Sequence, residues 1–271
     1  MTLFVPDVLR GEPAMTGSAR GTAAVMLLLG VPTLVVAMQL ARRGSARAVF
    51  VWFGTVLYLV YNAVMLTFAT PVNALFLANI ATLGLSIAAG IALFESARRL
   101  PVQQWCSGSM PTRGLAAYVW VVVVLNALAW LGRIIPALLD GDAAVLVAGT
   151  GLTTVPTYVQ DLAFWLPLLA VAGVWLRQRR PEGYLLVGGG LTMWVLEGLT
   201  VATDQWFGHQ ADPTSTVVSL SAVPAFAVIT VIGAAVLAVF LKHVQPMDTP
   251  ADSPPAQRDT RTTNAPQRNT P

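Results

Sequence analysis

Several polar or charged side chains stand inside long apolar stretches of this 271-residue sequence. A charged group at the centre of a membrane-spanning helix costs about 2.5–3.5 kcal/mol on insertion scales. Such groups are retained where they bind a ligand or pair with one another, so each is a candidate binding residue. The five candidates are Asn62, Asn79, Arg133, Asp161 and Glu197.

Helical spacing extends these candidates into polar stripes, because residues three, four or seven apart share one face of a helix. At 1.5 Å per residue, Arg133, Asp161 and Glu197 lie roughly 5–10 Å from the midplane of their stretches, all in the outer half of the membrane. Their stripes also contain Tyr58, Ser86, Asn126, Trp130, Tyr158, Trp165, Met193, Thr200 and Asp204. The sequence thus predicts one polar level shared by five helices.

This polar level has two interpretations. In the first, it lines a cavity that opens to the outside and binds a small solute. In the second, Arg133 pairs with Asp161 or Glu197, which neutralises the charges and holds the helices together. The residue types fit both interpretations, since the charges of one arginine and two acidic residues nearly cancel.

Residues for catalysis or metal binding do not gather in the apolar stretches. His209 and His243 fall outside them, so we expect no histidine cluster within the membrane. Cys106 lies in a short loop without a partnering histidine, and Lys242 stands at a helix end. We therefore expect no catalytic residue, no metal site and no cofactor, and an enzymatic activity is not favoured.

The apolar stretches predict the fold class. The chain is 55% hydrophobic and 11% charged, whereas soluble domains are about 25% charged. Each stretch has roughly 20 or more residues, which spans about 30 Å of hydrocarbon as a helix. The stretches are 21–41, 48–69, 72–97, 115–138, 156–177, 183–205 and 217–241. The sequence predicts an all-α polytopic protein with seven transmembrane helices.

Positive charges alternate between the loops and predict the topology. Arginines follow the first, third and fifth stretches, Lys242 follows the seventh, and the other three loops contain neither lysine nor arginine. By the positive-inside rule, the N-terminus is outside and the C-terminus is in the cytoplasm. We expect residues 1–20 to form an external tail, 21–243 the transmembrane domain, and 244–271 a disordered cytoplasmic tail.

An internal repeat is indicated by a shift of 135 positions. This shift places Pro32 on Pro167 and Asn62 on Glu197, so a mid-helix proline and a polar site match together. The first and fifth helices run in the same direction, so the repeat would be parallel, with three helices, a linking fourth and three more.

Three segments resemble a family of bacterial and archaeal polytopic membrane proteins whose function is unassigned. They are "PTLVVAMQLARRGS" from Pro32, "YLVYNAVMLTFATPVNALFLANIATLGLS" from Tyr58, and "DLAFWLPLLAVAGVWLRQRRPEGYLLVGG" from Asp161. The resemblance covers the first three helices, the fifth and the start of the sixth. It implies a seven-helix bundle and leaves the mechanism open.

Three functions remain open at this point. The repeat and the polar level favour a small-solute transporter or permease of the plasma membrane. The alternatives are a seven-helix sensor that binds a ligand in its cavity, and an accessory subunit that associates with a partner through its helices. The arginines lie singly or in pairs at helix ends, so we expect a lipid bilayer and a small molecule, but no nucleic acid, as partners. The oligomeric state stays open.

Overall fold

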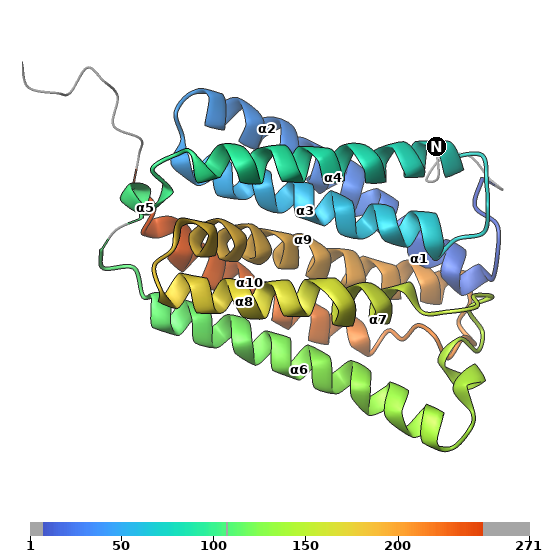
Figure 1. The fold of residues 1–271 in the computed structure, drawn as a ribbon. Helices are drawn as coiled ribbons and strands as arrows, with labels where there is room; N and C mark the ends of the chain where they lie inside the picture. Colours follow the sequence, from blue (N-terminus) through green and yellow to red (C-terminus); the bar gives the residue numbers. More distant parts are fainter. Residues whose placement is uncertain (1–7, 107, 246–271) are drawn as a thin grey trace, which may run out of the picture.

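The structure is a computed structural model that describes residues 8–106 and 108–245. The regular elements in these residues are helices, apart from one isolated bridge between Cys106 and Val244. Figure 1 shows the long helices lying side by side, so that the chain passes back and forth between two ends of the bundle.

Seven helical segments in the described residues are long and apolar enough to cross a membrane, which confirms the prediction of seven such helices. The first contains α1 (Pro13–Val25), the π-helical η1 (Met26–Gly30) and α2 (Val31–Arg42). The fifth likewise contains α7 (Pro156–Gln160), the π-helical η3 (Asp161–Trp165) and α8 (Leu166–Arg177). The other five are α3 (Ala46–Phe68), α4 (Phe76–Arg98), α6 (Thr112–Leu139), α9 (Pro181–Ala211) and α10 (Ala222–Lys242). A short α5 (Val102–Trp105) and a 3-10 turn, η2 (Ala143–Leu146), lie in the connections.

Two of these helices are longer than the sequence predicted, and they meet at their extra turns. The first helix begins at Pro13 rather than at residue 21, and α9 continues to Ala211 rather than ending near residue 205. Small residues on α1 allow this contact: a Cβ atom at Gly17 would lie 2.9 Å from the Cα atom of Gly208. Residues 13–20 of the predicted external tail are therefore helical, and residues 1–7 lie outside the described part.

The predicted C-terminal tail also begins later than residue 244. Val244 is fully buried, and the backbone N–H of Gln245 donates a 2.7 Å hydrogen bond to the carbonyl of Trp105. These contacts fasten the end of α10 to α5. Residues 246–271, to which the predicted disorder applies, lie outside the described part.

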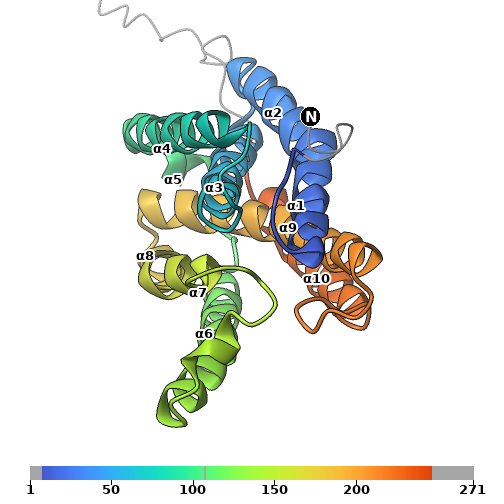
Figure 2. The same ribbon diagram turned by 90° about the vertical axis from the view of Figure 1, so that its right-hand side faces the viewer.

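α9 is the central helix of the bundle. It packs against α1, α3, α8 and α10, whereas α4 packs mainly on α3, and α6 mainly on α8. Figure 2 shows α4 and α6 at the edges of the bundle. The consecutive glycines 188–190 let large side chains approach α9, because Cβ atoms there would collide with Phe240, Phe53 and Leu169.

The connections that carry arginine lie at one end of the bundle. The α2–α3 turn, the α4–α6 connection and the α8–α9 turn all lie at the left in Figure 1. Near these turns, Arg98 and Arg180 form ion pairs with Glu182, at 3.9 and 3.6 Å. The assignment of this end to the cytoplasm stays a prediction.

Candidate functional site

Asn62 on α3 and Glu197 on α9 form the central polar contact of the bundle. The Asn62 Nδ2 atom donates a 2.7 Å hydrogen bond to Glu197 Oε2 and a 3.1 Å bond to the backbone carbonyl of Tyr58. These two acceptors fix the orientation of the amide. Asn62 is 1% exposed, and Glu197 is partly buried.

A second contact joins α3 and α9, one turn before Asn62 on α3 and one turn after Glu197 on α9. The hydroxyl groups of Tyr58 and Thr200 lie 2.8 Å apart, and both side chains are fully buried. Two turns from Asn62 along α3, Gly54 faces the backbone of Gly189, which brings the two helix axes close together. Glycine therefore permits the close approach of α3 and α9, and hydrogen bonds between polar side chains then join the two helices.

Asp161 opens the π-helical segment η3 and is 5% exposed. Trp130 on α6 donates a 2.8 Å hydrogen bond from Nε1 to Asp161 Oδ2. The phenol of Tyr61 on α3 also faces this carboxyl group, and the Tyr61 ring packs on Trp165, with centroids 6.0 Å apart. Asp161 thus joins α3, η3 and α6 in the bundle interior.

Asp204 is the third acidic group of the interior. The Thr22 hydroxyl lies 3.0 Å from both of its carboxylate oxygens, and Ser18 donates a 3.1 Å bond to its backbone carbonyl. Asp204 belonged to the predicted stripe of Glu197 but was not among the five candidates. Its position seven residues after Glu197 was the available signal.

Gln160 is a further polar residue that the sequence did not single out. Its Oε1 atom accepts a 3.1 Å hydrogen bond from the indole of Trp165. Its Nε2 atom has no partner in the described structure, although the side chain is only 9% exposed. A neutral residue near the start of an apolar stretch gave no sequence signal of this kind.

Arg133 and Asn79 do not join these residues. Arg133 is exposed on α6, and no ion pair among the described residues links it to Asp161 or Glu197. The predicted pairing is therefore wrong, because the residue of α6 that reaches Asp161 is Trp130. Asn79 donates a 3.1 Å bond to the carbonyl of Leu66 and thereby ties α4 to the end of α3.

The outcome is an interior acidic cluster, which we define as Asp161, Glu197 and Asp204. Glu197 lies near enough to the other two for the charges to interact. The described structure shows no ion pair to any of the three. Their hydrogen-bond partners are neutral hydroxyl, indole and amide groups. The charge balance expected from the sequence is therefore absent from the described bundle.

No protein-family model, curated protein or solved structure matches this chain. The resemblance to a polytopic family thus stays an expectation.

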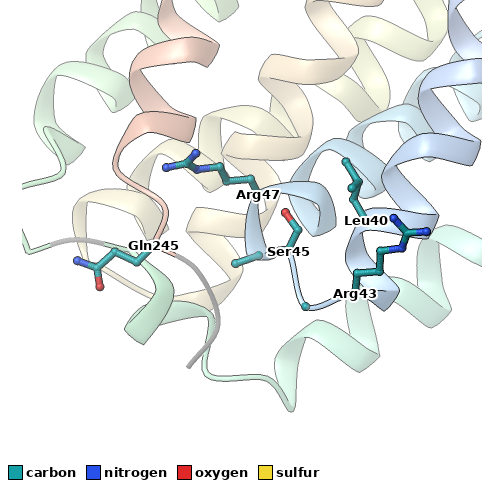
Figure 3. Close-up of a pocket in the computed structure, with 7 residues that line it drawn as sticks. Leu40, Arg43, Ser45, Arg47 and Gln245 are labelled. Atoms are coloured by element: carbon teal, nitrogen blue, oxygen red, sulfur yellow. The ribbon is translucent and has the colours of Figure 1, made fainter. Parts of the chain in front are cut away.

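The described residues form two surface pockets that do not include the acidic cluster. The first, of about 320 Å³, sits at the α2–α3 turn and is lined by residues that include Arg43, Ser45 and Gln245. Figure 3 shows its two arginines, Arg43 and Arg47, pointing in different directions. The pocket is about 22 Å from Asn62 along α3 at 1.5 Å per residue. The second is a shallow apolar depression between α6 and the fifth helix.

Proposed function

We propose that this chain is a small-solute transporter of the plasma membrane, with its solute site between α3 and α9 beside the acidic cluster. The observation that carries the proposal is the hydrogen bond between Asn62 and Glu197. These residues are separated by 135 positions, and this is the shift at which the two halves of the sequence match. In the proposed orientation the N-terminus is outside and the arginine-rich turns are cytoplasmic.

The two π-helical segments support a repeated architecture. Met26–Gly30 and Asp161–Trp165 are separated by the same shift, and so are the starts of α3 and α9. π-helix accounts for well under about 1% of residues in proteins. Two π-helical segments at equivalent positions therefore favour a repeat over chance. Each is followed at once by a helix with proline at its second residue, Pro32 and Pro167.

The contacts between α3 and α9 agree with an axis parallel to the helices. Such an axis brings equivalent residues together at the same level along the two helices. Gly54 faces its equivalent, Gly189, and two turns further along Asn62 bonds to its equivalent, Glu197. The two halves would then be related by rotation about the membrane normal, as in parallel-repeat carriers.

This arrangement provides the parts that a transporter needs. Hydrogen bonds, rather than ion pairs, join the proposed halves at Asn62–Glu197 and Tyr58–Thr200. Such bonds within membranes contribute only about 0.6 kcal/mol on average, so a rocking motion of one half against the other can exchange them. The π segments and the prolines that follow them weaken the backbone ladder where the helices would bend.

Access from each side of the membrane tests the proposal without a known substrate. We would place a cysteine at Glu197 or, as a second variant, at Thr200, in the full chain carrying Cys106→Ala. Oriented membrane vesicles would be treated with a membrane-impermeant cationic thiol reagent. The matched control is Leu77→Cys on α4, where the native side chain is 79% exposed on an apolar helix and should meet lipid.

Alternating access predicts that Glu197→Cys and Thr200→Cys react from both sides, while Leu77→Cys stays unreactive. Reaction from one side only would contradict transport and favour a ligand-binding sensor. Reaction from neither side would indicate a dry contact that holds helices together, and would overturn the proposal.

A further inference from the structure

We propose that the site beside the acidic cluster binds a small organic cation that also carries a hydrogen-bond acceptor, as an amino alcohol does. The inference deepens the proposed function and rests on it for the location of the site. It follows from three observations: the donors around the carboxyl groups, the aromatic rings beside Asp161, and the unpartnered amide of Gln160.

The groups that contact the cluster suit ionised carboxylates. The indole of Trp130 can only donate, and the orientation of Asn62 is fixed so that its Nδ2 atom faces Glu197. Thr22 places its hydroxyl against both oxygens of Asp204. The indole and amide N–H groups can only donate, which suits the ionised form of Asp161 and Glu197, whereas the Thr22 hydroxyl can also accept and suits either form of Asp204. A buried carboxylate either has a positive partner or takes up a proton, so a bound cation would keep these carboxyl groups ionised.

Aromatic rings surround the part of the cluster near Asp161. Tyr61 packs on Trp165, and Trp130 packs on Tyr158 with ring centroids 4.8 Å apart. Carboxylates combined with aromatic faces are the surroundings that ammonium groups prefer, because the ring faces attract positive charge. Among the described residues, no group of three or more His, Cys, Asp or Glu could hold a metal ion. The chemistry therefore favours an organic cation.

Gln160 is the independent sign that a ligand group is missing. Its side chain is nine-tenths buried, and Oε1 is held by Trp165, which leaves Nε2 as an unpartnered donor next to that indole. Gln160 directly precedes Asp161, and its partner Trp165 packs on Tyr61, whose phenol faces Asp161. A buried donor without a partner is unfavourable by about 1–3 kcal/mol. A hydroxyl or carbonyl oxygen on the ligand would satisfy it.

Equilibrium binding to the detergent-solubilised full chain tests the inference. The probes are choline, tetramethylammonium, sodium and propionate, and the readouts are tryptophan fluorescence and the shift of the melting temperature. We expect choline to bind about tenfold more tightly than tetramethylammonium, which lacks the oxygen that Nε2 of Gln160 would reach. Propionate should not bind, and sodium should give no comparable shift.

Three variants assign the effect to named groups. Glu197→Gln and Asp161→Asn should each weaken choline binding about tenfold or more, since each removes a charge. Gln160→Leu removes the unpartnered donor and also the acceptor of the Trp165 indole, so its two effects on stability oppose each other, and it should abolish the preference for choline over tetramethylammonium. The Gln160→Leu comparison keeps the test decisive if the acid variants do not fold.

Several results would overturn the inference. They are binding of propionate in place of choline, a sodium shift as large as that of choline, and an unchanged preference in Gln160→Leu. Binding in detergent does not depend on access from two sides. Choline binding with one-sided access would therefore refute transport alone, and two-sided access without choline binding would refute the ligand class alone.

Discussion

Asn62 donates a 2.7 Å hydrogen bond to Glu197 from a position 135 residues earlier in the chain. The bond lies between the two most buried helices of the bundle, α3 and α9. The amide cannot turn away without also losing its 3.1 Å bond to the carbonyl of Tyr58. The side chain therefore holds a carboxyl group and a helix backbone at the same time.

Replacing Asn62 with leucine should lower the free energy of unfolding by about 1–2 kcal/mol, because Glu197 loses its donor in the interior. The matched control is Asn79→Leu on α4, which loses a single bond to a neutral carbonyl at a less buried site. Unfolding in a denaturing detergent, followed by tryptophan fluorescence, measures both. An Asn62→Leu loss no larger than that of Asn79→Leu would contradict the assigned role.

Gly17→Ala should destabilise the protein, since a Cβ atom there would lie 2.6 Å from the carbonyl oxygen of Phe207 on α9. Gly84→Ala on α4 is the control, because nothing lies within 4 Å of the Cβ atom it would add. Alanine gains about 1 kcal/mol of helix propensity over glycine at both sites. The control should thus melt at the parent temperature or above, and Gly17→Ala below it. Equal melting temperatures would mean that α1 and α9 do not pack as described.

Cys106 should resist alkylation while the protein is folded. Burial raises the pKa of its thiol to about 12, so only about one molecule in 10,000 carries the thiolate at pH 8. A maleimide should label the native protein slowly and the unfolded protein fast, where the pKa returns to about 8.5. Because the folded pKa is the higher one, the associated stability is present below about pH 8.5 and declines as the pH rises toward 12. Rapid labelling of native protein would show that the contact of Cys106 with Val244 opens.

The fold followed from the sequence more fully than the site did. Seven apolar stretches suffice to predict seven helices, since each must satisfy its backbone hydrogen bonds internally in a bilayer. Asn62 and Glu197 were also predicted to share a level, because depth depends only on the rise per residue. Which side of a helix faces the bundle is a different question. Trp130 and Arg133 are three residues apart and share one stripe of α6, so their spacing alone does not show that Trp130 reaches Asp161 while Arg133 is exposed.

The π-helical segment at Asp161 introduced a second difficulty. The predicted stripe of Tyr158, Asp161 and Trp165 assumed regular α-helical spacing. A π-helical turn adds a residue and rotates the following side chains by about 100° relative to that spacing. Tyr158 and Asp161 accordingly contact Trp130, whereas Trp165 turns to Tyr61. The rotation also brings the indole of Trp165 to the amide of Gln160, a contact that regular spacing does not predict.

The two neighbours on α6 provide the sharpest test of the corrected site. Trp130→Phe keeps the aromatic ring but removes the donor to Asp161, and we expect it to lower the free energy of unfolding by about 1–2 kcal/mol. Arg133→Leu should cause no loss of stability, because the described structure gives the exposed arginine no ionic partner. Both variants would be measured by unfolding in a denaturing detergent, followed by circular dichroism because one of them lacks a tryptophan. If Arg133→Leu were the more damaging variant, the arginine would pair with the acidic cluster after all. The cluster would then lack the uncompensated charge on which the proposed cation site depends.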